Sequence, residues 1–219
     1  MDTLIDLFLH LDQHLAAVTT AYGPWVYGLL FLIVFAETGL VVTPVLPGDS
    51  LLFAVGALGA TGTLNPFLSV VLLLVAAVAG DAVNYAVGKA VGPRIFAAHD
   101  SASLLHRLLN RDHLRQAHEF FERYGGKAVV LGRFVPIVRT FVPFVAGAGA
   151  MTYSQFVFYN VVGGIAWVGI CIGAGYAFGN MPIVKENFSL VVLGIIFVSV
   201  LPAVFEFLRS RRGGLSGAA

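Results

Sequence analysis

Two arginines lie inside a hydrophobic stretch near the middle of the chain. Residues 133–147 read Arg-Phe-Val-Pro-Ile-Val-Arg-Thr-Phe-Val-Pro-Phe-Val-Ala-Gly, so Arg133 and Arg139 share this segment with two prolines. An arginine at membrane depth costs about 2.5–3.5 kcal/mol even on lenient insertion scales. Charged, broken backbone persists at that depth only inside protein or beside water. The segment therefore predicts a binding site, and the guanidinium groups favour phosphate or carboxylate as the ligand.

Breaks in the helix would bring the two arginines together. In an unbroken helix a separation of six residues rotates their side chains about 240° apart, whereas proline removes a backbone donor and interrupts the helix. A second hydrophobic stretch, residues 25–59, is interrupted in the same way. The breaks expected in the two stretches are at Pro44, Pro47, Gly48, Pro136, Pro143 and Gly147. Freed amides and the hydroxyl of Thr140 are then candidate donors to a phosphate, beside Arg133 and Arg139.

Three carboxylates in apolar surroundings are the candidates for proton coupling: Glu37, Asp49 and Asp81. Glu37 follows twelve largely apolar residues, so burial favours its neutral form, while a nearby arginine favours its ionised form. Intramembrane carboxylates are usually functional. The alternatives are an ion network between these carboxylates and the arginines that only supports the fold, a helix cap at Asp49, and a hydrogen bond across the hairpin at Asp81.

Composition and charge distribution predict a membrane protein. The chain has 219 residues, 58% of them hydrophobic and 11% charged, whereas soluble domains carry about 25% charged residues. The net charge of +1 argues against a nucleic-acid surface. The first residues are acidic, unlike a cleavable signal peptide. Residues 1–88 contain no Lys or Arg, and seven of the thirteen fall in 89–127. The 89–127 connection and the C-terminus are therefore expected in the cytoplasm.

The hydrophobic segments predict one polytopic all-α membrane domain over residues 1–219. Clean spans are expected at 67–88, 156–179 and 188–208, the last being a C-terminal transmembrane helix. The broken stretches at 25–59 and 128–150 are expected to form two opposed re-entrant helical hairpins. An interfacial amphipathic helix is expected at 1–21, and a cytoplasmic connection at 91–123.

The two halves, residues 22–90 and 124–180, match each other weakly. A shift of 91 residues places Gly56 on Gly147, Tyr85 on Tyr176 and Gly88 on Gly179. By the charge rule the first long span ends in the cytoplasm, whereas its counterpart begins there, so the repeats are expected to be inverted. Inverted repeats with broken helices at matching positions indicate a transporter with its site near the bilayer midplane.

These residues resemble the DedA family of bacterial inner-membrane proteins. The first half carries the resemblance in Glu37, Pro44, Pro47-Gly48-Asp49, Gly80-Asp81 and Tyr85-x-x-Gly88-Lys89. The second half carries it in Phe120-Phe121-x-Arg123-x-Gly125 and Arg133-Phe134-x-Pro136-x-x-Arg139-Thr140-x-x-Pro143-x-x-Ala146-Gly147. Lys89 is a mild departure, since arginine is expected there about as often.

The resemblance covers roughly residues 20–180. It implies translocation of undecaprenyl phosphate, a polyprenyl phosphate, across the inner membrane, coupled to the proton gradient. It also implies roles in envelope integrity, cell division and tolerance of alkaline pH and cationic antimicrobials. Distant eukaryotic relatives of the family behave as phospholipid scramblases.

Other functional classes fit the residues less well. All six histidines lie outside the intramembrane segments, which argues against a phosphatase and against metal-dependent hydrolysis. A non-enzymatic transporter without metal or cofactor is expected, with lipid and protons as partners and homo-oligomerisation left open. A proton-coupled exporter of small cations and an uncoupled scramblase remain alternatives. Trp25 and Trp167 are expected to serve packing.

Overall fold

The described part of the chain is helical. The computed structural model describes residues 23–40, 48–97, 111–179 and 181, and contains no strand within these ranges. The helical elements are α3 (Trp25–Gly39), α4 (Gly48–Ala60), α5 (Pro66–Ala97), α7 (Arg111–Tyr124), α8 (Lys127–Gly132), α9 (Pro136–Val145), the π-helical η1 (Ala146–Ala150) and α10 (Tyr153–Gly179). The expected helices at 1–21 and 188–208, like Pro44 and Pro47, lie outside the described residues.

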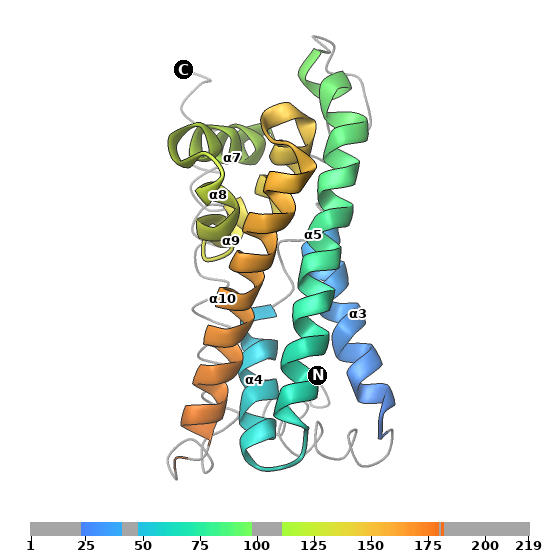
Figure 1. Cartoon of the computed structure of the whole chain (residues 1–219), viewed down its shortest axis with the longest axis vertical. Coiled ribbons are helices and arrows are strands. Elements are labelled where there is room, and N and C mark those ends of the chain that lie inside the picture. Colours follow the sequence, from blue (N-terminus) through green and yellow to red (C-terminus); the bar gives the residue numbers. More distant parts are fainter. Residues whose placement is uncertain (1–22, 41–47, 98–110, 180, 182–219) are drawn as a thin grey trace, which may run out of the picture.

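Two long helices, α5 and α10, run along the long axis of the molecule (Figure 1). Pro66–Gly92 and Tyr153–Gly179 each contain 27 residues, with mean hydropathies of 2.2 and 1.8. At about 1.5 Å per residue, each is long enough for a hydrocarbon core of about 30 Å. The predicted spans at 67–88 and 156–179 fall inside these helices. Length and composition are thus consistent with an α-helical membrane protein.

Local sequence determines where α5 begins and α7 ends. The side-chain oxygen of Asn65 accepts a hydrogen bond from the backbone amide of Leu68 at 3.0 Å. Pro66 follows at the first helical position, where its missing N–H leaves no bond unmade. α7 ends at Tyr124 because Gly125 adopts a positive φ of 56°, and its amide bonds the carbonyl of Phe121 at 2.7 Å. This is the usual glycine terminus of a helix.

The break between α8 and α9 lies at residues 133–135, just before Pro136. Val135 is extended, with φ −116° and ψ 106°, because the residue before proline avoids the helical region. The expected breaks at Pro143 and Gly147 are wrong. Pro143 lies inside α9, where the buried neighbours Val142 and Phe144 anchor the helix in the core.

Gly147 continues the helical path within η1, and the non-helical residue there is Gly149, with φ 133°. The absence of a side chain at Gly147 serves a close contact instead. A Cβ at this position would collide with the carbonyl of Tyr85 on α5. Gly56 on α4 has the same relation to α10, where a Cβ would collide with the carbonyl of Ile172.

Through these contacts, short helices of each half of the chain pack on the long helix of the other half. α4 of the first half packs on α10 of the second, while α9 and η1 of the second half pack on α5 of the first. Gly56 and Gly147 are the pair that the 91-residue shift aligns. This reciprocal packing is what an internal repeat would produce. Repeat inversion and re-entry into a membrane stay predictions.

A polar layer separates two apolar cores. One core includes Tyr85 of α5 and Phe156 of α10, with residues of α7, α8 and α9. The other includes Leu73 of α5 and Trp167 of α10, with residues of α3 and α4. Asp81 and Asn160 lie between these positions on their helices and are buried. The site is therefore built where both long helices change from one core to the other.

Candidate functional site

Arg139 is held by two carboxylates from the first half of the chain. It lies in the second turn of α9 and forms ion pairs with Glu37, near the end of α3, and with Asp49, in the first turn of α4. The distance from Nη1 of Arg139 to Oδ1 of Asp49 is 2.8 Å. Glu37 is buried, whereas the Asp49 side chain is 32% exposed. We call Arg139, Glu37 and Asp49 the Arg139 cluster.

The segment that begins α4 fits tightly around the carboxylate of Glu37. A Cβ on Gly48 would overlap both oxygens and the carboxyl carbon of Glu37, so any larger residue would force this carboxylate to move. The Oε2 atom of Glu37 is buried and has no hydrogen-bond partner in the described part of the chain. Asp49 does not precede the helix as a cap but lies inside the first turn of α4, where a negative charge is favoured by the helix dipole.

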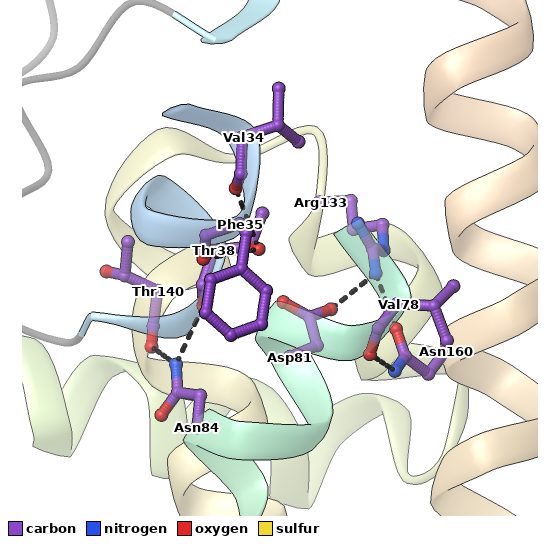
Figure 2. A network of polar contacts seen from close by, with 9 residues as sticks. All are labelled: Val34, Phe35, Thr38, Val78, Asp81, Asn84, Arg133, Thr140 and Asn160. Atoms are coloured by element: carbon purple, nitrogen blue, oxygen red, sulfur yellow. Dashed lines mark hydrogen bonds and ion pairs between the residues drawn. The ribbon is translucent and has the colours of Figure 1, made fainter. Parts of the chain in front are cut away.

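Arg133 forms a second, more deeply buried cluster. Its Nη2 donates to Oδ2 of Asp81 on α5 and to Oδ1 of Asn160 on α10. The amide nitrogen of Asn160 donates in turn to the carbonyl of Val78 at 3.0 Å. Figure 2 shows Arg133 between these two partners. The side chains of Arg133 and Asp81 are only 2% and 3% exposed. We call Arg133, Asp81 and Asn160 the Arg133 cluster.

Arg133 has donors without acceptors among the described residues. A guanidinium has five N–H groups, but Nε and Nη1 of Arg133 are buried and make no hydrogen bond to the described residues. Buried donors are nearly always paired with protein, water or ligand. Arg133 can therefore donate hydrogen bonds to a further acceptor, such as a phosphate oxygen or water.

Trp167 joins the two clusters. Its indole Nε1 donates to Oδ1 of Asp49 at 2.7 Å. The guanidinium carbons of Arg139 and Arg133 lie 5.0 and 5.8 Å from its ring centre, within the range of cation–π attraction. Both arginines thus converge on one side chain of α10, as a break between them was expected to permit.

Asn84 ties the backbones beside the site together. Its amide nitrogen donates to the carbonyl of Thr140 at 2.7 Å and to that of Thr38 at 3.4 Å (Figure 2). Thr140 follows Arg139 on α9, and Thr38 follows Glu37 on α3. The carbonyl of Thr38 belongs to the last turn of α3, where helical acceptors lack intrahelical partners. Asn84 therefore fixes the spacing between the elements that carry Glu37 and Arg139.

The structure sorts the residues chosen from sequence into two groups. It joins Glu37 and Asp49 to Arg139, and Asp81 to Arg133. Trp167, Asn160 and Asn84 were missed. Asn84 and Asn160 stand out as amides in apolar helices, a signal that was available. Trp167 has no such signal, because a tryptophan in an apolar span packs more often than it binds.

Metal chemistry receives no support from the described residues. They contain no group of three or more His, Cys, Asp or Glu side chains arranged to hold an ion. The three carboxylates of the two clusters each face an arginine instead.

The comparisons with known proteins identify the family. A VTT domain matches residues 46–177, which include most of both clusters. Protein DedA of Escherichia coli strain K12 is 51% identical over 217 residues, or 98% of this chain and 97% of that protein. The chain belongs to the DedA family. The resemblance to this family that the sequence motifs indicated is thus confirmed.

Other DedA relatives are named as membrane proteins. The inner membrane protein YqjA of E. coli strain K12 is 35% identical over 179 residues, covering 82% of this chain and 79% of YqjA. An uncharacterised membrane protein of Mycobacterium tuberculosis strain H37Rv is 42% identical over 198 residues, covering 87% of this chain and 82% of that protein. No solved structure shows a significant match.

Proposed function

We propose that this DedA-family protein translocates a polyprenyl phosphate, such as undecaprenyl phosphate, across the bacterial inner membrane in exchange for or together with protons. The observation that carries the proposal is the pairing of Arg139 with Glu37 and Asp49 beside a second, buried arginine. Carboxylate and phosphate bind guanidinium with similar geometry. The two carboxylates therefore occupy Arg139 as internal competitors that a lipid phosphate replaces.

The arginines divide the work of binding the phosphate. Arg139 becomes available when its carboxylates release it, and Arg133 offers Nε and Nη1, which have no partner among the described residues. Thr140, next to Arg139 on α9, is a further proposed donor. The polyprenyl chain stays in the hydrocarbon while the headgroup crosses through the polar layer between the two apolar cores.

A charge imbalance supports proton coupling. In the two clusters the carboxylates of Glu37, Asp49 and Asp81 face the guanidiniums of Arg133 and Arg139. With all five ionised the site has one excess negative charge, and an arriving phosphate adds more. Like charges in a buried site disfavour joint ionisation, so binding is expected to require protonation of a carboxylate.

Glu37 is the first choice for that proton. It is buried, and its Oε2 lacks a partner among the described residues, so a proton can be held there without breaking an existing hydrogen bond. Asp49 accepts from both Arg139 and Trp167 and reaches solvent. Asp81 is engaged by Arg133 and is kept as a secondary coupling residue.

The membrane arrangement is part of the proposal. α5 and α10 would span the bilayer, and the helices around the two breaks would enter and return as opposed hairpins. The 89–127 connection and the C-terminus would lie in the cytoplasm, with 188–208 as a further span. The protein would act as a transporter and not as an enzyme, with homo-oligomerisation left open.

Vesicles with a defined pH gradient test the proposal. The protein would be reconstituted with labelled undecaprenyl phosphate, and headgroup movement between leaflets followed with and without the gradient. Movement accelerated by the gradient supports the proposal. Movement that the gradient leaves unchanged assigns an uncoupled scramblase instead. Transport of small cations without lipid movement would favour the exporter, although both arginines would then have to leave the carboxylates.

A further inference from the structure

Trp167 contacts residues of both the Arg139 cluster and the Arg133 cluster. It is 1% exposed, in the middle of α10, and belongs to the apolar core formed with α3, α4 and α5. Its indole nitrogen nevertheless bonds Asp49, and both guanidiniums lie near its ring. One side chain thus contacts both clusters, from a helix that supplies neither of the arginines nor any of the carboxylates.

One carboxylate oxygen of Asp49 accepts from both Trp167 and Arg139. Oδ1 of Asp49 accepts from Nε1 of Trp167 at 2.7 Å and from Nη1 of Arg139 at 2.8 Å. The indole is a donor only and, when buried, needs an acceptor. If a phosphate takes the Nη1 donor, Asp49 still keeps the indole as a partner. The displaced carboxylate is therefore not left without a hydrogen-bond donor.

The ring has a second effect on the two arginines. Guanidinium groups repel each other, yet both lie within about 6 Å of the same indole, the distance at which an aromatic face attracts cations. Desolvation strengthens that attraction. The ring therefore favours the close placement of two positive groups that a phosphate needs, before any phosphate has arrived.

We infer that Trp167 is a positioning residue of the anion site: it holds Asp49 in place while a lipid phosphate displaces that carboxylate from Arg139. The inference rests on the proposed function and adds a residue with a specific task to it. The step is an exchange of hydrogen-bond acceptors at Nη1 of Arg139, without covalent change.

Binding measurements on three variants test this role. In Trp167→Phe the ring persists but the N–H is lost, so displacing Asp49 leaves that carboxylate without its indole donor. The dissociation constant for undecaprenyl phosphate in detergent is expected to rise about tenfold, the usual scale for a hydrogen bond to a charged group. Asp49→Asn removes the charged competitor. The double variant Trp167→Phe, Asp49→Asn should therefore bind as Asp49→Asn alone does.

The matched control is Trp25→Phe, because Trp25 is 80% exposed at the first residue of α3, twelve residues before Glu37. It should bind like the unmodified protein. Equal dissociation constants for Trp167→Phe and the unmodified protein would overturn the inference. A loss in Trp167→Phe that persists undiminished in the Asp49→Asn background would also overturn it, since a general packing defect does not depend on Asp49.

Fluorescence provides a test that leaves Trp167 intact. The chain has two tryptophans, so Trp25→Phe isolates the emission of Trp167. Adding Asp49→Asn should shift that emission without any lipid, because the charged acceptor of the N–H is lost. Identical spectra would overturn the inference. A shift with Asp49→Asn in a protein that neither binds nor moves undecaprenyl phosphate would establish the contact but overturn the proposed function, and with it the role in anion exchange.

Discussion

Arg139 and Arg133 lie against the same indole ring, yet their carboxylate partners differ in number and exposure. Arg139 faces two carboxylates, one of which, Asp49, has a side chain 32% exposed. In the described part of the chain Arg133 faces a single carboxylate, Asp81, and both side chains are almost fully buried. The Arg133 cluster is charge-balanced and closed, while the Arg139 cluster has excess negative charge and reaches solvent. The difference assigns ligand exchange to the Arg139 cluster, while the Arg133 cluster supports the fold and holds Arg133 in a fixed position beside the phosphate.

The largest expected effect separates the clusters by stability. Removing one partner of a buried ion pair costs about 3–5 kcal/mol because the other charge is left uncompensated. Arg133→Ala should therefore destabilise the protein by about that amount, through the isolated carboxylate of Asp81. Arg139→Ala should cost less, since Asp49 is 32% exposed and Glu37 is the carboxylate proposed to take up a proton. Thermal unfolding in detergent measures both.

The double variant Arg133→Gln, Asp81→Asn is the control for this comparison. It removes both charges and keeps polar groups of similar size, so it should recover much of the lost stability without restoring transport. A protein in which Arg139→Ala is the more destabilised of the two single variants would reverse the assignment of the clusters.

The next effect concerns function at the exchanging arginine. Arg139→Lys keeps the charge but loses the planar fork that matches phosphate and carboxylate. Transport of undecaprenyl phosphate should fall about tenfold or more, the scale of one lost charge-assisted hydrogen bond. Arg115→Lys is the control, because Arg115 lies on α7 with its side chain 70% exposed. Near-normal transport by the Arg139→Lys protein would indicate that only charge balance matters there.

The sequence predicted the members of the Arg139 cluster because charged residues in apolar segments are costly and conspicuous. Glu37, Asp49 and Arg139 each stand out for this reason. Because a buried charge needs an opposite charge close by, they were expected to lie together. Asp81 was also chosen, but nothing in the sequence assigns it to Arg133 and not to Arg139. That choice depends on the path of α8 into the break, which only the structure shows.

The fold was predictable where hydrophobic length and turn residues agree. α5 and α10 follow from their apolar runs, and Asn65-Pro66 marks the start of α5. The break predicted at Pro143 was wrong, because the sequence does not reveal that packing of Val142 and Phe144 keeps α9 helical through this proline. Trp167 was missed since a buried tryptophan is compatible with ordinary packing, and only its position between two arginines gives it a role.

A change in pH should affect the Arg139 cluster more than the Arg133 cluster. Phosphate adds negative charge to a site whose carboxylates already outnumber its arginines, and protonation of Glu37 offsets that charge. Binding of undecaprenyl phosphate should therefore tighten as the pH falls, by at most about tenfold per pH unit for one proton. Titration of the dissociation constant in detergent measures the slope.

The variant Glu37→Gln sharpens this test, because it keeps the size of the side chain but cannot titrate. It should bind undecaprenyl phosphate with little pH dependence and lose acceleration by an imposed gradient. A pH slope that survives in Glu37→Gln and disappears in Asp81→Asn would move the coupling proton to the Arg133 cluster.

The smallest expected effect is that of Asp49→Asn, at the exposed edge of the Arg139 cluster. Partly solvated ion pairs contribute up to about 1 kcal/mol, and asparagine can still accept the indole N–H with its side-chain oxygen. Unfolding in detergent should therefore change by no more than about that amount. Because a neutral amide competes weakly for Arg139, undecaprenyl phosphate should bind a few-fold tighter. Weaker binding would mean that Asp49 contacts the ligand favourably, and Arg139 would then not be the place where carboxylate and phosphate exchange.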